Sequence, residues 1–254
     1  MPGRLPGTVL AADRFETFGD VHLALLAVFA VGAVAVVLLG RRLRGRDSAL
    51  LVSRVLAVLL VAVTVPSQVY QLLPAQFDLS TSLPLQLCDL AWIAAVWALW
   101  TQGRVPTALT YFWGLTLTVQ GVLTPSLAEA FPDPLFLAFW GLHFLVVFAA
   151  LFLTLGLGLG PRWREYAVTV GVTASWAVLV YAFNTVTGVN YGYLNRKPRS
   201  ASLFDYLGPP PFYVLAALVV VVSVWALMTW PWMGRLTRCE PPTPSSRSGR
   251  PSRP

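Results

Sequence analysis

The sequence predicts an all-α, polytopic membrane protein, a bundle of seven transmembrane helices, and two features of its composition carry this prediction. Of the 254 residues, 56% are hydrophobic and 11% are charged, and the mean hydropathy is +0.67. Soluble domains carry roughly 25% charged residues, so a water-soluble globular enzyme is excluded. The apolar residues also fall in blocks of about 20, the length that crosses a hydrocarbon core about 30 Å thick.

Seven such blocks follow one another along the chain. We expect spans at about 21–40, 50–69, 83–100, 105–124, 135–157, 166–186 and 209–230. They form one transmembrane domain, 21–230, after an extracytoplasmic segment, 1–20. Prolines 209–211 fit the first turn of the last span, where the amides have no intrahelical partner. The Pro/Ser/Arg-rich composition of 231–254 predicts a disordered, basic cytoplasmic tail.

The few basic residues predict the orientation, because cytoplasmic loops carry the excess of Lys and Arg. The basic residues of alternate loops and of the tail fall on one side: Arg41, Arg42, Arg44, Arg46, Arg54, Arg104, Arg162, Arg164, Arg235, Arg238, Arg247, Arg250 and Arg253. Only Arg4, Arg14, Arg196, Lys197 and Arg199 fall on the other side. We therefore expect the N-terminus outside and the C-terminus in the cytoplasm. Topology also explains the net charge of +7, so no nucleic-acid partner is expected.

Polar side chains inside the spans are costly in hydrocarbon and therefore mark candidates for function. A rise of 1.5 Å per residue puts several of them near the outer ends of five helices. They are His22, Gln86, Cys88, Asp89, Gln120, Thr124, His143 and Asn184. The inner halves of these helices hold few comparable groups. The sequence therefore predicts a polar, substrate-binding pocket that opens toward the outer leaflet.

Within this layer, Cys88 and His143 are the candidates for catalysis. A thiol is a strong nucleophile only as thiolate, and an imidazole can accept its proton. Asp89 or an asparagine could orient the imidazole, as the third member of a triad does. The alternatives are a cysteine that serves packing and a histidine that joins two helices. Two histidines and one nearby cysteine do not give a zinc spacing, so we expect no metal and no other cofactor.

The segment between the last two spans is rich in Asn, Gly, Tyr and Pro, which indicates a structured loop. We expect it to cover the pocket as a lid, with Asn190 and Tyr191 at the substrate. The basic residues Arg196, Lys197 and Arg199 then suit anionic lipid headgroups. The alternative is an interfacial loop whose aromatic side chains rest on the headgroups.

Three motifs carry a resemblance to a known family. They are LPLQLCDLAW at 83–92, FPDPLFLAFWGLHF at 131–144, and NYGYLNRKP at 190–198 followed by GPPP at 208–211. Over more than half of its length the chain resembles the YwaF-type bacterial integral membrane proteins. The last motif of that family is closer to Gly-Pro-Trp-Pro, and here Pro210 stands where the tryptophan would be.

The YwaF-type proteins are in turn similar to a eukaryotic transmembrane acyltransferase family that remodels ether phospholipids with a proposed Cys/His pair. The resemblance places that cysteine at Cys88 and that histidine at His143. It implies a lipid acyltransferase or acyl hydrolase in the bacterial cytoplasmic membrane, acting on phospholipids or other acyl esters. Gln86, Gln120 or Asn190 would then donate to the oxyanion.

Two other classes of function stay open from the sequence. One is a transporter for a small polar solute, although polar residues concentrated on one side of the bundle argue against it. The other is a seven-helix sensor or scaffold in which the basic tail engages a partner. Nothing in the sequence identifies a protein partner.

Overall fold

The computed structural model describes residues 15–125, 127, 129–197, 206–209 and 212–236, and the regular secondary structure of this part is entirely helical. Seven helical runs follow one another. They are α1 (Asp20–Leu43), α2 (Ser48–Leu72), α3 (Leu87–Thr101), the continuous run of α4 (Arg104–Phe112), η1 (Trp113–Thr118) and α5 (Val119–Leu123), that of α6 (Pro134–Leu151) and η2 (Phe152–Gly156), α7 (Trp163–Thr187) and α8 (Phe212–Leu236). A short 3-10 turn, η3 (Tyr191–Tyr193), lies between α7 and α8.

Five of these runs are long and apolar enough to cross a membrane: α1, α2, α6 with η2, α7 and α8. Helix α3 is apolar but has only 15 residues, and a π-helical segment, η1, interrupts the run from α4 to α5. The structure therefore confirms a helical membrane protein. It gives full-length spans for five of the seven predicted segments.

Helices α3 and α8 have boundaries that differ from the expectations. Helix α3 begins at Leu87, four residues after the apolar block starts, since Pro84 disfavours helical geometry at the residue before it. Helix α8 begins at Phe212, so Pro209 precedes the helix instead of occupying its first turn. The same helix continues through Pro231 to Leu236, so the first part of the predicted disordered tail is helical. Residues 1–14 and 237–254 lie outside the described part.

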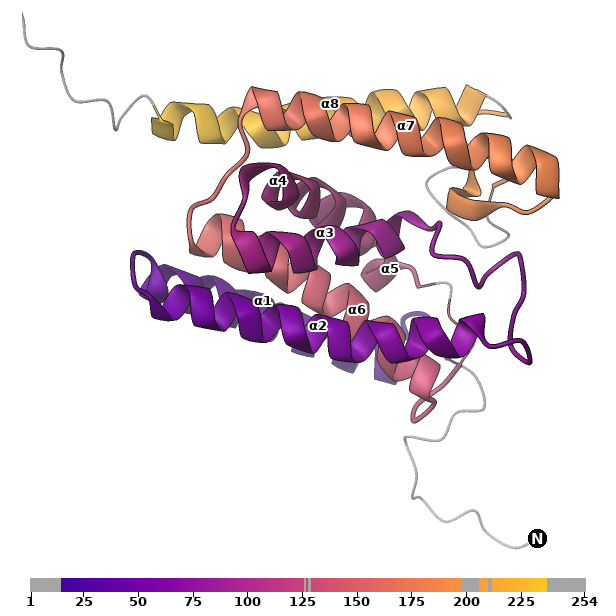
Figure 1. Cartoon of the computed structure of the whole chain (residues 1–254), viewed down its shortest axis with the longest axis horizontal. Helices are drawn as coiled ribbons and strands as arrows, with labels where there is room; N and C mark the ends of the chain where they lie inside the picture. The colour runs from indigo at the N-terminus through magenta and orange to yellow at the C-terminus, as the bar shows by residue number, and fades with distance from the viewer. Residues whose placement is uncertain (1–14, 126, 128, 198–205, 210–211, 237–254) are drawn as a thin grey trace, which may run out of the picture.

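The helices form three layers, which Figure 1 shows edge-on. Helices α1 and α2 form one outer layer, and α7 and α8 form the other. The middle layer holds α3, the α4–α5 run and α6. Helix α6 packs against helices α1 to α5, and α7 packs against α4 and α8. The middle layer thus provides the core, and the outer pairs shield it from lipid.

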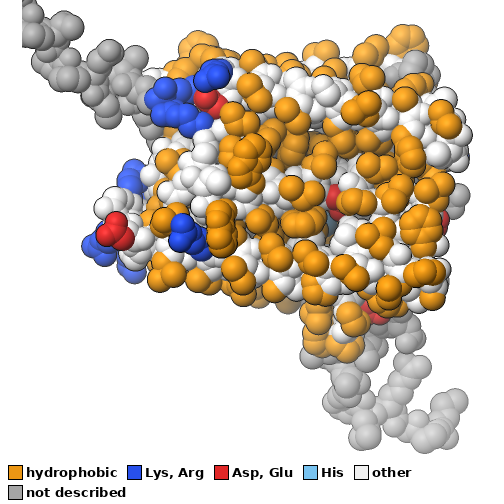
Figure 2. Space-filling model, viewed as in Figure 1, with side chains coloured by type: hydrophobic (Ala, Val, Ile, Leu, Met, Phe, Trp, Pro, Cys, Tyr) orange, Lys and Arg blue, Asp and Glu red, His pale blue; other side chains and the backbone are white. Residues whose placement is uncertain are grey.

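The outer surface is apolar, as a hydrocarbon environment requires. Val31, Val186 and Trp230 expose 72%, 86% and 72% of their surface. Figure 2 shows hydrophobic side chains over most of the visible face, whereas Lys and Arg gather at the end where α1 stops and α7 starts. We call this end of the bundle the arginine end.

Close helix contacts at the arginine end depend on glycine. A Cβ on Gly40 of α1 would lie 2.7 Å from the Cα of Gly156 in η2, so the two backbones touch. The side chain of Arg44 then reaches the free carbonyl groups at the end of η2. Its Nη2 donates to Gly156 O at 2.6 Å, and its Nε donates to the same oxygen at 3.1 Å. A cation at a helix C-terminus is favoured by the helix dipole, so Arg44 closes this helix end.

Candidate functional site

His143 lies in the middle of α6 with its imidazole almost fully buried. Its Nδ1 lies 2.7 Å from the carbonyl oxygen of Phe139. A carbonyl oxygen can only accept, so Nδ1 carries the proton of the hydrogen bond. In the neutral ring, Nε2 then keeps a free lone pair, and it faces Gly121 of α5. The absence of a side chain at Gly121 leaves room for this imidazole edge.

His22, the other histidine, has both ring nitrogens occupied. Its Nδ1 accepts from Phe18 N–H at 2.9 Å, and its Nε2 lies 2.9 Å from Val122 O. The residue is completely buried among aromatic rings that include Phe15 and Trp140. His22 therefore ties the start of α1 to α5. Of the two histidines, His143 alone has a ring nitrogen without a hydrogen-bond partner among the described residues.

Cys88 is a free, partly buried thiol in the first turn of α3. The carboxylate of Asp89 accepts from Gln86 N–H at 2.9 Å and so caps the start of this helix. The sequence suggested that Asp89 or an asparagine would orient His143. The carbonyl group of Phe139 holds the imidazole instead, because it lies one helical turn before it on the same helix.

The positions of Cys88 and His143 along their helices are matched. Cys88 lies thirteen positions before Thr101 at the end of α3, and His143 lies thirteen positions before Gly156 at the end of η2. Both helix ends lie at the arginine end, where the next residues, Gln102 and Leu157, line one pocket. At 1.5 Å per residue of α-helix, Cys88 lies about 20 Å from that end, and His143 lies about 12 Å before the start of the π-helical η2. Helices α3 and α6 also pack against each other.

Tyr191 and Asn184 join the α7–α8 loop to the start of α3. The Tyr191 hydroxyl donates to Leu79 O at 2.8 Å and accepts from Leu83 N–H at 3.0 Å. The Asn184 amide bonds the backbone N–H and C=O of Tyr191, both at 2.9 Å. Burial raises the pKa of the Tyr191 phenol, so its hydroxyl stays neutral and can both donate and accept. These contacts occupy the polar groups of both residues within the protein.

The rest of the loop is held in a similar way. Gln86 accepts from Gly192 N–H at 2.9 Å through Oε1. Asn190 Nδ2 donates to Arg196 O at 2.8 Å, and its Oδ1 accepts from two backbone amides. Arg196 donates to Gly188 O at 2.9 Å, and Lys197 Nζ lies 5.7 Å from the ring centre of Tyr213. The loop is therefore structured, and it rests on α3 through Gln86.

Three further predicted site residues do not take part in these loop contacts: Gln120, Thr124 and Arg199. Gln120 has an exposed side chain near the end of α5. The Thr124 hydroxyl, also exposed, donates to Gln120 O at 3.1 Å. Arg199 lies outside the described residues.

Four buried polar atoms of the described part have no hydrogen-bond partner: Trp92 Nε1, Thr107 Oγ1, Thr118 Oγ1 and Trp140 Nε1. Trp92 follows Cys88 by four residues on α3, so the two share a helix face. Long side chains on a helix point back toward its N-terminus, which directs the Trp92 ring toward the turn of Cys88. Trp92 is not among the site residues predicted from the sequence, where only its spacing of four residues from Cys88 is visible.

Other hydroxyl groups in the spans bond to their own helices. The hydroxyls of Thr110, Thr154, Thr169 and Thr229 each donate to the carbonyl group four residues earlier. The donor of each of these hydroxyls is therefore satisfied within its own helix. Among the described residues, no group of three or more His, Cys, Asp or Glu side chains could hold a metal ion.

The fold and these contacts define a multi-pass helical membrane protein with one base-like histidine inside the bundle. The model of the TMEM164 family, a transmembrane protein family, matches residues 17–229, and the chain belongs to this family. No curated protein and no solved structure matches the chain. The match supports the membrane class that the motifs indicated, and the YwaF-type relationship stays a prediction.

We predict that Tyr191→Phe loosens the start of α3. The change removes one hydroxyl that bonds both Leu79 O and Leu83 N–H, at an expected cost of about 1–2 kcal/mol. Hydrogen exchange in detergent micelles should rise at residues 79–90. Tyr206→Phe is the matched control, because Tyr206 is 87% exposed. Unchanged exchange at Leu83 in Tyr191→Phe would show that the hydroxyl does not hold this segment.

Proposed function

We propose that the protein is a membrane lipid acyltransferase or acyl hydrolase that uses Cys88 as nucleophile and His143 as general base. The observation that carries the proposal is the hydrogen bond from His143 Nδ1 to Phe139 O, which leaves Nε2 as a base inside the bundle. The matched positions of Cys88 and His143 on two packed helices support it. The resemblance to a Cys/His acyltransferase family supports it independently.

In the proposed reaction, His143 Nε2 accepts the proton of the Cys88 thiol as the sulfur attacks the acyl carbonyl carbon. The bond between that carbon and the alcohol oxygen breaks, and the leaving alcohol takes the proton from Nε2. A thioester then links the acyl chain to Cys88. An acceptor hydroxyl group, or water, gives its proton to His143 and attacks the thioester, and the returning proton restores the thiol.

The oxyanion of each tetrahedral intermediate needs a donor beside the sulfur, and we assign this role to Trp92 Nε1. It is a buried N–H without a partner on the same helix face as Cys88. A buried donor without a partner costs about 1–3 kcal/mol, and an oxyanion would satisfy it. Asn190 is a weaker candidate than the sequence suggested, because loop contacts already occupy its amide.

The remaining parts of the proposal concern membrane and substrate. We propose seven spans in a bacterial membrane, with the N-terminus outside and the C-terminus in the cytoplasm. This orientation would place Cys88 and the other polar side chains near the outer helix ends toward the outer leaflet. Arg196, Lys197 and Arg199 would bind the phosphate of a phospholipid there. Gln86, Gln120, Thr124, Asn184, Asn190 and Tyr191 would shape the site, Asn184 and Tyr191 by positioning the loop.

The central test is turnover by the purified full chain. The substrates are phospholipid vesicles with a fluorescent acyl chain and a lysophospholipid as acceptor. Cys88→Ala should reduce acyl release and transfer to background, and His143→Ala should reduce them at least about 100-fold. Cys239→Ala, in the tail, is the matched control and should keep full activity. Turnover that survives Cys88→Ala would refute the mechanism, and solute flux that survives Cys88→Ser would favour a transporter.

The assignment of Trp92 has its own test in the same assay. Trp92→Phe keeps an aromatic ring but removes the N–H, so turnover should fall by about 100-fold with the fold intact. Trp140→Phe is the control, because it removes a second unpartnered indole N–H from a separate aromatic cluster. If both variants lose activity equally, or Trp92→Phe keeps it, Trp92 is not the oxyanion donor.

A further inference from the structure

One short piece of helix covers the nitrogen that the proposed reaction needs. A Cβ on Gly121 of α5 would overlap His143 Nε2, so the backbone of α5 lies directly against this nitrogen. The lone pair of Nε2 therefore faces α5, whereas Cys88 lies on α3. A thiol or an acyl ester reaches that lone pair only when α5 moves aside.

Helix α5 is a separately bounded unit of five residues, Val119–Leu123. The π-helical segment η1 precedes it, and Thr124 leaves helical geometry after it, with φ −134° and ψ 68°. A π-helical segment inside a helical run is rare and often lies at a functional site. Thr118, the last residue of η1, has a buried hydroxyl without a partner among the described residues. The joint before α5 therefore lacks a side-chain bond that would fix it.

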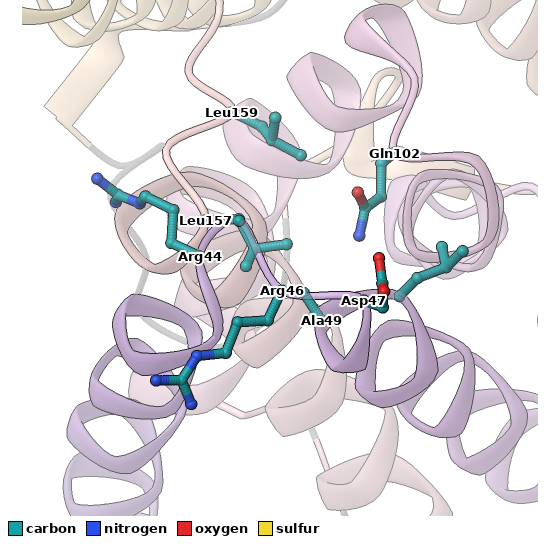
Figure 3. Close-up of a pocket in the computed structure, with 9 residues that line it drawn as sticks. Arg44, Arg46, Asp47, Ala49, Gln102, Leu157 and Leu159 are labelled. Carbon is teal, nitrogen blue, oxygen red and sulfur yellow. The ribbon is translucent and has the colours of Figure 1, made fainter.

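The other end of the same helical run is anchored by side chains. Gln102, just before α4, donates to Ser53 Oγ of α2 at 3.0 Å. Figure 3 shows Gln102 and Arg44 on opposite sides of the pocket at this arginine end, and Arg44 holds Gly156 O. A movement of the run would therefore take place at its α5 end.

His22 of α1 holds the α5 end in place. A carbonyl oxygen can only accept, so His22 Nε2 donates to Val122 O, at 2.9 Å, while Nδ1 accepts from Phe18 N–H. Within the part of the chain that the structure describes, this is the one hydrogen bond that joins α5 to another helix. Val122 follows Gly121 directly, so the bond fixes the backbone of α5 against His143.

We propose that α5 is a gate over His143 and that His22 is the positioning residue that holds this gate shut. The proposal rests on the assignment of His143 as the base and adds how that base is reached. While His22 is bonded to Val122 O, Gly121 covers Nε2. When the bond breaks, α5 tilts away at η1, and the thiol and the acyl ester can approach. A site that is open for only part of the time binds its substrate more weakly by that fraction.

The experiment measures how fast diethyl pyrocarbonate modifies His143 Nε2 in the full chain in detergent micelles, read by mass spectrometry after digestion. His22→Phe removes the donor to Val122 O. It should speed the modification about fivefold, the factor that corresponds to one hydrogen bond of about 1 kcal/mol. His22→Gln keeps an N–H donor and should behave like the wild type. Tyr166→Phe is the matched control, because it removes a bond between α7 and α8, from the Tyr166 hydroxyl to Val222 O.

Two further measurements support the test. In the wild type, hydrogen exchange should be faster at residues 119–123 of α5 than at residues 104–112 of α4, and equal protection would show that α5 does not open by itself. In the turnover assay, His22→Phe should lower the KM for the acyl donor up to about fivefold with kcat unchanged, because the site is open for a larger fraction of the time. A fall in kcat with KM unchanged would contradict the gate.

Other outcomes overturn the proposal. Equal modification of His143 in the wild type and in His22→Phe would show that His22 does not hold α5 shut. An equal increase in His22→Gln or in Tyr166→Phe would indicate general loosening of the bundle instead of the loss of one bond. The modification and exchange measurements need no turnover. Turnover that survives Cys88→Ala, with the gate behaving as expected, would therefore reject the catalytic mechanism but not the gate.

Discussion

A polar group inside hydrocarbon must find its partner within the protein, and this constraint organises the whole bundle. Threonine hydroxyls bond their own helices, and tryptophans bond across helices, as Trp113 Nε1 does to Thr173 Oγ1 at 2.9 Å. His22 joins α1 to α5 through Nε2, while its Nδ1 accepts from Phe18 N–H just before α1. At the arginine end, Arg44 donates to the carbonyl group of Gly156, which has no hydrogen-bond donor within its own helix. Most polar side chains in the spans are therefore structural.

The exceptions to this rule are informative because each has a cost. Trp92 Nε1 is buried without a partner one turn from Cys88, and His143 Nε2 keeps a lone pair beside Gly121. Thr118, on the run that leads to Gly121, is a further buried hydroxyl without a partner. An unpartnered donor and an unpartnered base, together with a thiol nucleophile, are the elements that acyl transfer requires. Their coincidence on α3 and α6 is the physical basis of the proposed function.

The membrane class could be predicted from sequence because length and hydropathy of a span are local properties. The sequence could not predict which side of each helix packs against its neighbours, because helices that are apolar on every side carry no periodic signal. The bonds from Tyr191 to Leu79 and Leu83 likewise join residues more than a hundred positions apart. The sequence could therefore mark Tyr191 and Asn184 as unusual but not assign them to holding the loop. Trp92 was hidden for the same reason, since its missing partner appears only in three dimensions.

The most direct measurement is the intact mass of the protein after exposure to a phospholipid acyl donor without an acceptor. We expect one acyl chain on the Cys88 sulfur, removable by hydroxylamine as a thioester is, and no adduct in His143→Ala. Turnover of the same donor with no acyl group ever found on Cys88 would show that Cys88 is not the nucleophile.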